Sequence, residues 1–469
     1  MVEATLVIYL VILLGIGYWA NKRINVMEDF LLAGRKLGLL LAAGALAATH
    51  FGGGMVMGGG EYGFDYGLSG AWYGFACGIG LIILGFLTAG KFRKLSFYTV
   101  PDYLEHRYGG KVLRILGSLL SLVAIIGIIA AQVLSARGAL AILGFTGNTG
   151  AIIATIIFII YTALGGLWAA SITDFVQVII AGVGVVVASA LVLGDAGGFA
   201  GLREMIASSR GVVETGYFNI FGMGGTTILW LLLPTVMYTL IGQDFYQRLF
   251  AAKDNLTAKK ASFIGGVFLI IISLFPAIAG MGARGYFPDL VDGSKAIPRI
   301  IEEVFPIGAG AIVLAALLAA IMSTADSLLT AGTSHIINDL WLKLRKSGNG
   351  NSYDKKNMLK ISRIFTVILG LLALIIALLV PAIIDALIYS YTMYIGGVFI
   401  PVIGGVLWKK ATKEGALSAL IIGALIAIIG TVFSIEIANI PVVVYSSIVS
   451  LLLFIFVSLA TFDTKAETK

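Results

Sequence analysis

The fold is decided by a glycine-rich stretch at residues 47–67, which reads AATHFGGGMVMGGGEYGFDYG. It contains six glycines within the nine residues 52–60. Glycine costs about 1 kcal/mol relative to alanine in a helix interior, so propensity predicts that a helix breaks here. A break inside a membrane span frees backbone carbonyls, which protein, water or ions must then satisfy. The alternative interpretation is tight helix packing through small residues.

The composition excludes a soluble fold. Of the 469 residues, 59% are hydrophobic and 12% are charged, whereas soluble domains are roughly 45–50% apolar and about 25% charged. The single cysteine, Cys77, excludes an intramolecular disulfide and a thiolate metal cluster. The three histidines, His50, His106 and His335, are scattered and form no zinc-binding motif.

Thirteen apolar runs are long enough to cross a hydrocarbon core of about 30 Å, which takes about 20 residues of helix. The first run continues directly into a basic segment with no small-residue cleavage site, so we interpret it as a retained span and not a signal peptide. The runs lie near residues 3–20, 37–60, 68–90, 112–137, 150–169, 173–194, 226–250, 260–283, 308–340, 359–380, 383–408, 415–434 and 441–460.

Basic residues indicate the orientation of these spans. All but six of the 32 lysines and arginines fall in alternate loops and in the tail. The positive-inside rule therefore predicts a multi-pass inner-membrane (plasma-membrane) protein with its N-terminus outside and its C-terminus in the cytoplasm. The net charge of +7 follows from these loops, and no basic face for nucleic acid is present.

The span order also predicts an inverted repeat. Spans two to six and spans seven to eleven start on opposite sides of the membrane, and such five-helix sets commonly build transporters with the substrate at the midplane. We expect a peripheral first helix and cytoplasmic loop at 1–36 and a first repeat at 37–194. A second repeat at 226–408 and two peripheral helices with a short tail at 409–469 complete the expected organisation.

The ninth span carries a polar stripe. Ala320, Ser323, Thr324 and Ser327 are spaced to share one helix face. Such hydroxyls often bond back to their own helix, which is the alternative to a binding role. Asp326 favours a binding role, because insertion of an aspartate at a helix centre costs about 2.5–3.5 kcal/mol.

Two further polar segments are candidates. Asp174 begins the sixth span between Thr173 and Gln177, either as a functional acid or as an ordinary acid at a helix start. Gln243 and Tyr246 lie near the end of the seventh span, where they either gate a cavity or belong to an amphipathic helix end. Because hard cations take oxygen ligands, carbonyls of a broken helix with Ser and Thr hydroxyls are suited to sodium.

Together these segments resemble the sodium/solute symporter family, which includes proline, sugar, sialic acid, pantothenate and choline carriers. The resemblance rests on the broken second span and on three ordered motifs: GGLWAASITDFVQ at 165–177, GQDFYQRLFAAKD at 242–254 and AAIMSTADSLL at 319–329. It implies an all-α, LeuT-like fold of five-plus-five helices with three peripheral helices. It also implies a sodium site formed by Ala48, Phe51, Ala320, Ser323 and Thr324.

The resemblance further implies a second cation position and a substrate site. Asp174, Asp326 and Ser327 match the second position, although Asp326 stands where relatives have a hydroxyl, so a second sodium, a proton or an ion pair remain alternatives. The substrate candidates are His50, Gly52, Gly53, Gly54, Trp72, Tyr73, Gln243, Tyr246, Tyr389 and Tyr391.

The expected function is sodium-coupled symport of a small organic solute by alternating access, with an amino acid such as proline or another small carboxylate preferred. A proton-coupled symporter is the main alternative. An intramembrane enzyme using Asp174 and Asp326, or a sensor, is less favoured, and we expect no enzyme activity. The expected partners are sodium, a small solute and the bilayer, with no nucleic acid and no obligatory protein partner.

Overall fold

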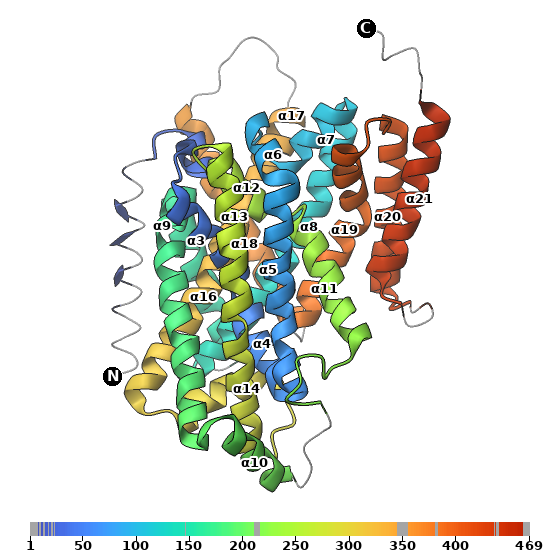
Figure 1. Ribbon diagram of the computed structural model, residues 1–469. Coiled ribbons are helices and arrows are strands. Elements are labelled where there is room, and N and C mark those ends of the chain that lie inside the picture. Colours follow the sequence, from blue (N-terminus) through green and yellow to red (C-terminus); the bar gives the residue numbers. More distant parts are fainter. Residues whose placement is uncertain are drawn as a thin grey trace.

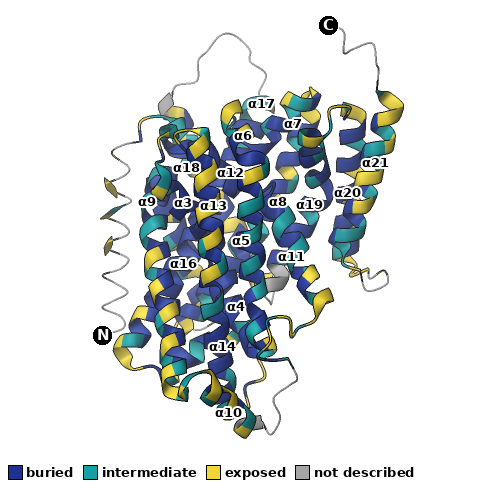
Figure 2. Cartoon of the chain, viewed as in Figure 1, coloured by how far each residue is buried: buried dark blue, intermediate teal, exposed yellow. Residues whose placement is uncertain are grey.

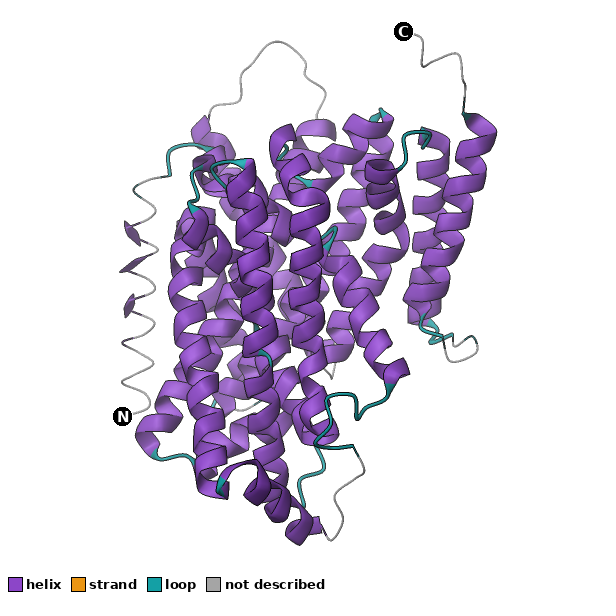
Figure 3. Ribbon diagram, in the orientation of Figure 1, coloured by secondary structure: helices purple, strands orange, loops and turns teal. Residues whose placement is uncertain are grey.

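The computed structural model describes residues 24–145, 147–210, 216–344, 355–379, 383–435, 437 and 440–462, with residues 8, 11, 12, 15, 16, 18, 19 and 22 before them. Every regular element formed by these described residues is a helix (Figure 3). The predicted first span at 3–20 lies largely outside the described residues, as does the predicted tail.

The first half of the chain contains two short helices and then the glycine-rich span. Its helices are α2 (Met27–Leu32), η1 (Ala33–Arg35), α3 (Leu39–His50), α4 (Gly53–Tyr66), η2 (Gly67–Ala71), α5 (Trp72–Leu84), η3 (Gly85–Ala89), α6 (Gly90–Leu95), α7 (Val100–Tyr108), α8 (Lys111–Ala141), α9 (Asn148–Ala196) and α10 (Gly198–Arg210).

The second half begins with another interrupted span. Its helices are α11 (Gly225–Thr239), α12 (Gln243–Ala251), α13 (Asn255–Ile272), α14 (Leu274–Tyr286), η4 (Gly293–Lys295), α15 (Ala296–Arg299), η5 (Ile300–Val304), α16 (Ile307–Ser334), η6 (His335–Trp341), α17 (Leu342–Leu344), α18 (Lys355–Leu379), α19 (Ile383–Leu407), α20 (Lys413–Val432) and α21 (Val442–Thr461).

Nine helical segments within the described residues are long and apolar enough to cross a membrane, and the α11–α12 pair, bent by 42°, is a further candidate. One of these segments, α9, contains more than one pass. In α9, Gly166 has a positive φ of 50°, and the hydroxyls of Tyr161 and Thr173 are in contact. Twelve residues of straight helix would separate them by about 18 Å, so α9 folds back on itself. The total of thirteen spans remains a prediction.

The side chains are distributed as expected for a protein in lipid. Large apolar residues are exposed on the outer surface, including Phe86, Leu379 and Phe456, whereas many polar residues are fully buried. In Figure 2 the buried positions fill the middle of the bundle and the exposed ones lie along its outside. This arrangement places the polar groups between helices, where they can bind one another or a solute.

Most of the glycine-rich stretch is helical. The break is confined to Phe51 and Gly52, and α4 continues through both Gly53–Gly54 and Gly58–Gly60. Glycines after the break serve close packing: a Cβ at Gly60 would lie 2.3 Å from Ile297 Cγ1, and one at Gly63 would lie 2.2 Å from the Ala277 carbonyl oxygen. From the facing helix α14, a Cβ at Gly280 would lie 1.9 Å from the Gly60 carbonyl oxygen. The stretch therefore contains both a helix break, at Phe51 and Gly52, and a region of close helix packing, after Gly52.

Helices α4 and α12 are largely buried in the bundle, whereas α11 keeps one face at its surface. Helices α20 and α21 pair at one edge, beside α19 (Figure 1). Basic loops that we predict on one side of the membrane also contact one another. Arg93 donates to the carbonyls of Ala252 and Lys253, and Arg107 donates to that of Lys409. These contacts support the predicted grouping of the loops.

Candidate functional site

The break between α3 and α4 releases two carbonyls from their helical partners. In a continuous helix the Ala48 carbonyl would accept from Gly52 N and the Thr49 carbonyl from Gly53 N. Instead, Gly52 N donates to the His50 carbonyl at 2.8 Å, and Gly53 N donates to Gln132 Oε1 at 2.9 Å. The released carbonyls therefore need other partners inside the protein.

Hydroxyls of α16 supply those partners. Thr324 Oγ1 donates to the Ala48 carbonyl at 3.1 Å and to the Thr49 carbonyl at 3.2 Å, and Ser323 Oγ lies 3.3 Å from the Ala48 carbonyl. Both hydroxyls also reach the Ala320 carbonyl. Ala48, Ala320, Ser323 and Thr324 thus form one buried group of oxygen atoms. Phe51, also buried, ends α3 at the same place, and its ring packs edge-on against Phe268.

The second interrupted span meets the first beside this group. Between α11 and α12 the helix stops at Leu240–Gly242, after Pro234 has removed one backbone donor. His50 Nε2 lies 2.9 Å from Thr239 Oγ1, and the His50 ring lies 4.3 Å from that of Phe245. The ends of α3 and α11 are therefore joined directly.

A narrow cavity lies against both breaks. Its volume is about 10 Å³, which is room for about one water molecule, so the helices have closed around this position. The substrate candidates His50, Gly52, Gly54, Tyr73 and Tyr391 line it. Its other lining residues are Thr49, Ile128, Gln132, Tyr238, Asp244, Phe245, Thr324 and Leu387.

The remaining substrate candidates have other partners. Gln243 bridges Val100 N and the Tyr98 carbonyl, both at 2.9 Å, and Tyr246 donates to Thr88 Oγ1 at 2.7 Å. Trp72 donates to the Ile220 carbonyl, and Tyr389 is exposed. A Cβ on Gly53 would meet Ser135. These five residues lie outside the cavity lining in this structure.

The cavity contains polar groups that the sequence did not single out. Gln132 replaces the missing helical partner of Gly53, and Asp244 places a carboxylate in the lining, where Tyr238 donates to it at 3.1 Å. Asp244 lies within one of the four motifs, between Gln243 and Phe245, so its motif position was a usable signal. Gln132 sits in an ordinary apolar span and offered no comparable signal.

Arg248 forms a buried ion cluster with the residues of the second cation position. Its Nη2 lies 3.2 Å from Asp174 Oδ2 and also donates to Ser327 Oγ. Its other donors reach the carbonyls of Ala45 and Asp244. Ser327 Oγ is 3.4 Å from Asp326 Oδ1. Arg248 is fully buried between helices, although the predicted orientation counts it among the basic residues of the loops.

Two oxygens of this cluster have no hydrogen-bond partner among the described residues. They are Asp174 Oδ1 and Asp326 Oδ2, both buried. A single guanidinium therefore serves two neighbouring carboxylates, and it pairs directly with Asp174.

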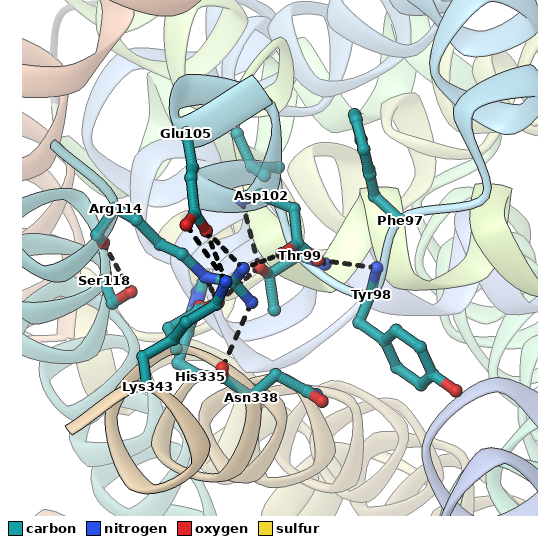
Figure 4. Close-up of polar contacts among 12 residues, drawn as sticks. Phe97, Tyr98, Thr99, Asp102, Glu105, Arg114, Ser118, His335, Asn338 and Lys343 are labelled. Carbon is teal, nitrogen blue, oxygen red and sulfur yellow. Dashed lines mark hydrogen bonds and ion pairs between the residues drawn. The ribbon is translucent and has the colours of Figure 1, made fainter. Parts of the chain in front are cut away.

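A second polar network joins α7 to α8, η6 and α17 (Figure 4). Arg114 pairs with Glu105 and with Asp339, each at 2.7 Å, and also with Asp102. Lys343 pairs with Glu105 at 2.8 Å. Burial would raise the pKa of Glu105, but hydrogen bonds from Lys343 and Arg114 outweigh it and hold this pKa below its usual value.

His335 belongs to the same network. Its Nδ1 lies 2.7 Å from Asp339 Oδ2 and its Nε2 lies 2.7 Å from Ser121 Oγ. The network lies at the end of the bundle that carries the basic loops. It holds α7 against α8, η6 and α17 at that end.

Comparisons with known proteins identify the family. The profile of the "Sodium:solute symporter family" matches residues 30–423. A sodium/pantothenate symporter of Escherichia coli (strain K12) is 30% identical, with 96% of this chain and 94% of the relative covered. The chain belongs to the sodium:solute symporter family. The protein is therefore a sodium-coupled carrier of a small solute and not an enzyme.

Two further relatives support this family assignment. The high-affinity proline transporter PutP of Bacillus subtilis (strain 168) is 31% identical, with 89% of each chain covered. A solved structure of a sodium-coupled sialic acid symporter, in its substrate-bound outward-open state, has a TM-score of 0.84 at 20% identity and covers 98% of this chain and 97% of its own. The expected LeuT-like fold is thereby confirmed, and sodium is the coupling ion.

Proposed function

We propose that the coupling sodium binds where the α3–α4 break meets α16. Its ligands are the carbonyls of Ala48, Phe51 and Ala320 and the hydroxyls of Ser323 and Thr324. The observation that carries the proposal is the Ala48 carbonyl, which the break has released and which both hydroxyls reach. A cation placed among these oxygens replaces hydrogen bonds that the site already makes, so binding needs little rearrangement.

Replacement of Ser323 or Thr324 by alanine tests this site. Each variant removes one ligand of a buried cation, and hydrogen bonds to charged groups contribute about 1.5–3 kcal/mol. We expect the sodium concentration for half-maximal uptake to rise roughly 10- to 100-fold. The matched control is Thr333→Ala, because Thr333 lies on the same helix but bonds to Leu329 and Thr366. Sodium dependence that stays unchanged in the Ser323 and Thr324 variants overturns the assignment.

We propose a small amino acid as the solute. The cavity offers Asp244 for an ammonium group, and the N-terminus of α4, where Gly54 lines the cavity, favours a carboxylate. Two relatives are named for pantothenate and proline, which both carry a carboxylate. The phenol groups of Tyr73 and Tyr391, 3.2 Å apart, also line the cavity.

A panel of amino acids, organic acids and sugars tests this solute class. Melting temperatures of the purified protein are measured with each compound in sodium chloride and in potassium chloride. A ligand that binds the native state raises the melting temperature, and we expect an amino acid to do so only with sodium. Asp244→Asn should abolish the response to amino acids and spare the response to a carboxylate without an amine. A sugar as the sole active compound contradicts the proposal.

The second cation position is proposed as an internal ion pair. The Arg248 guanidinium pairs with Asp174 and Ser327, and Asp326 lies beside them. Because the guanidinium takes the place of a second cation, this arrangement favours one sodium per solute.

We also propose an inverted pair of repeats at 37–194 and 226–408, with flanking segments at 1–36 and 409–469. The proposed location is the plasma membrane, with the N-terminus outside.

A further inference from the structure

An apolar groove with two lysines at its rim lies on the outer surface, away from the solute cavity. Its volume is about 350 Å³, and it is lined by Ile82, Gly85, Phe86, Lys259, Lys260, Phe263 and Ile264. The groove runs between the α5–η3 segment and α13. Since both elements belong to apolar candidate spans, it faces the bilayer at the end where the basic loops gather.

The local backbone explains the groove. The helix widens into a π-helical turn at Gly85–Ala89, and such turns are frequent at functional sites. A Cβ on Gly85 would lie 3.1 Å from Ser262 Cβ, so glycine lets α13 approach at this point. Beside this approach the Phe86 and Phe263 rings meet edge to face at 6.1 Å and form an apolar wall.

The apolar walls are open to the membrane. The exposed fractions of Phe86, Phe263 and Ile264 are 76%, 46% and 44%. A liquid water occupies about 30 Å³, so the groove is large enough for a length of acyl chain. Apolar side chains facing lipid are ordinary in a membrane protein, and the concave shape alone would not select any lipid.

The two lysines supply that selectivity. Both are exposed, and neither forms an ion pair with an acidic residue within the part of the chain that the structure describes. Lys259 runs along the surface of Gly90, since a Cβ there would lie 2.3 Å from Lys259 Cε. Lys91 and Lys94 are exposed on the adjoining α6, which adds positive charge at the same rim.

We propose that this groove binds an anionic phospholipid. The headgroup phosphate pairs with Lys259 and Lys260, and one acyl chain lies against Ile82, Phe86, Phe263 and Ile264. Basic pockets between membrane helices on the cytoplasmic side have the chemistry to hold such headgroups. A zwitterionic headgroup brings its own cation to an already positive rim, so a headgroup with net negative charge is preferred.

Native mass spectrometry of the purified full-length protein tests the proposal, with titration of phosphatidylglycerol and, separately, phosphatidylcholine. We expect one tight phosphatidylglycerol adduct. Each lysine near an anionic lipid contributes about 1 kcal/mol, so the double variant Lys259→Gln/Lys260→Gln should weaken this adduct roughly thirtyfold. The matched control is Lys409→Gln/Lys410→Gln, an adjacent exposed pair at another basic loop, which should leave it unchanged.

A third variant tests the apolar wall of the groove independently of the two lysines. Ile264→Trp fills the apolar wall but keeps both lysines, and it should also weaken the adduct. The melting temperature of each variant shows that it is folded. Three results overturn the proposal: phosphatidylcholine binding as tightly, equal weakening in the Lys409/Lys410 control, or undiminished binding in either the lysine or the tryptophan variant.

Discussion

At the scale of single residues, the buried charge of Arg248 has the largest electrostatic effect on the fold. A guanidinium removed from water requires both a counter-charge and acceptors for its donors. Asp174 supplies the counter-charge, and Ser327 with the carbonyls of Ala45 and Asp244 supplies further acceptors. These groups come from α3, α9, α12 and α16, so one side chain ties four helices together next to the proposed sodium site.

Arg248→Gln should therefore be strongly destabilising. It leaves the carboxylates of Asp174 and Asp326 buried without their cation, and breaking a buried pair costs about 3–5 kcal/mol. The exposed pair of Arg299 with Glu303 offers the control, because Arg299→Gln removes only an ion pair that water screens. Thermal unfolding in detergent compares the two variants. Equal losses of stability would contradict the role given to Arg248.

The environment of Arg248 could not be predicted from its own segment. Its motif predicts a polar helix end, and polar helix ends usually lie at the membrane–water interface. The residue is buried because Asp174, which is 74 positions earlier, lies opposite it in the fold. By contrast, the spacing of Ser323, Thr324 and Ser327 was local information, and the structure does place these hydroxyls on a buried face.

At the scale of elements, the α3–α4 break depends on close contact with α16. Gly52 has a negative φ of −106°, so an alanine could adopt its backbone conformation. A Cβ there would, however, lie 2.1 Å from Thr324 Oγ1 and 2.9 Å from Gln132 Oε1. Glycine is required at this position for space and not for conformation.

Gly52→Ala should push Thr324 out of the proposed sodium site. Overpacking typically costs about 1–3 kcal/mol, so we expect sodium activation to weaken by about tenfold or more. Gly59→Ala is the control in the same stretch, because its Cβ would lie 3.4 Å from Pro276, an ordinary contact. Sodium titration of uptake measures both, and a Gly52 variant that behaves like the Gly59 variant would refute this explanation.

The second polar network, which joins α7 to α8, η6 and α17, should make the stability of the protein depend on pH through Glu105. A carboxyl group whose pKa is lowered on folding adds stability above its unfolded value, and this contribution is lost as the pH falls through the folded value. At pH 7, Glu105→Gln should cost roughly 1 kcal/mol, as expected for two partly exposed ion pairs. The difference in melting temperature from the unmodified protein should shrink below pH 4.5, the ordinary value for this residue. A difference that is constant between pH 7 and pH 4 would exclude this mechanism.

Glycine content predicted that a break exists but not its extent. Propensity treats all six glycines alike, whereas the structure uses Gly52 for the break and Gly60 for contact with α14. The difference comes from the neighbouring helices, which a propensity argument does not contain. The second break lies at Leu240–Gly242, where α11 has ended and Gly242, in an extended conformation, precedes α12.

At the scale of the whole molecule, orientation is the next property to test. Cys77 is buried, so single cysteines can be introduced elsewhere without background labelling by an impermeant maleimide. Val291→Cys, at a position with an exposed fraction of 94%, should be labelled in intact cells. Lys410→Cys should be labelled only after the membrane is opened. The reverse pattern would contradict the predicted orientation.

The central claim is that sodium binding at the junction of the α3–α4 break and α16 drives solute uptake. The most direct test is uptake of the labelled solute identified in the binding panel, by purified protein in liposomes, with an inward gradient of either sodium or potassium. The account predicts accumulation with sodium, its collapse when an ionophore dissipates the gradient, and its loss in the Ser323→Ala/Thr324→Ala double variant. Equal uptake with sodium and potassium, or accumulation driven by a proton gradient alone, would contradict it.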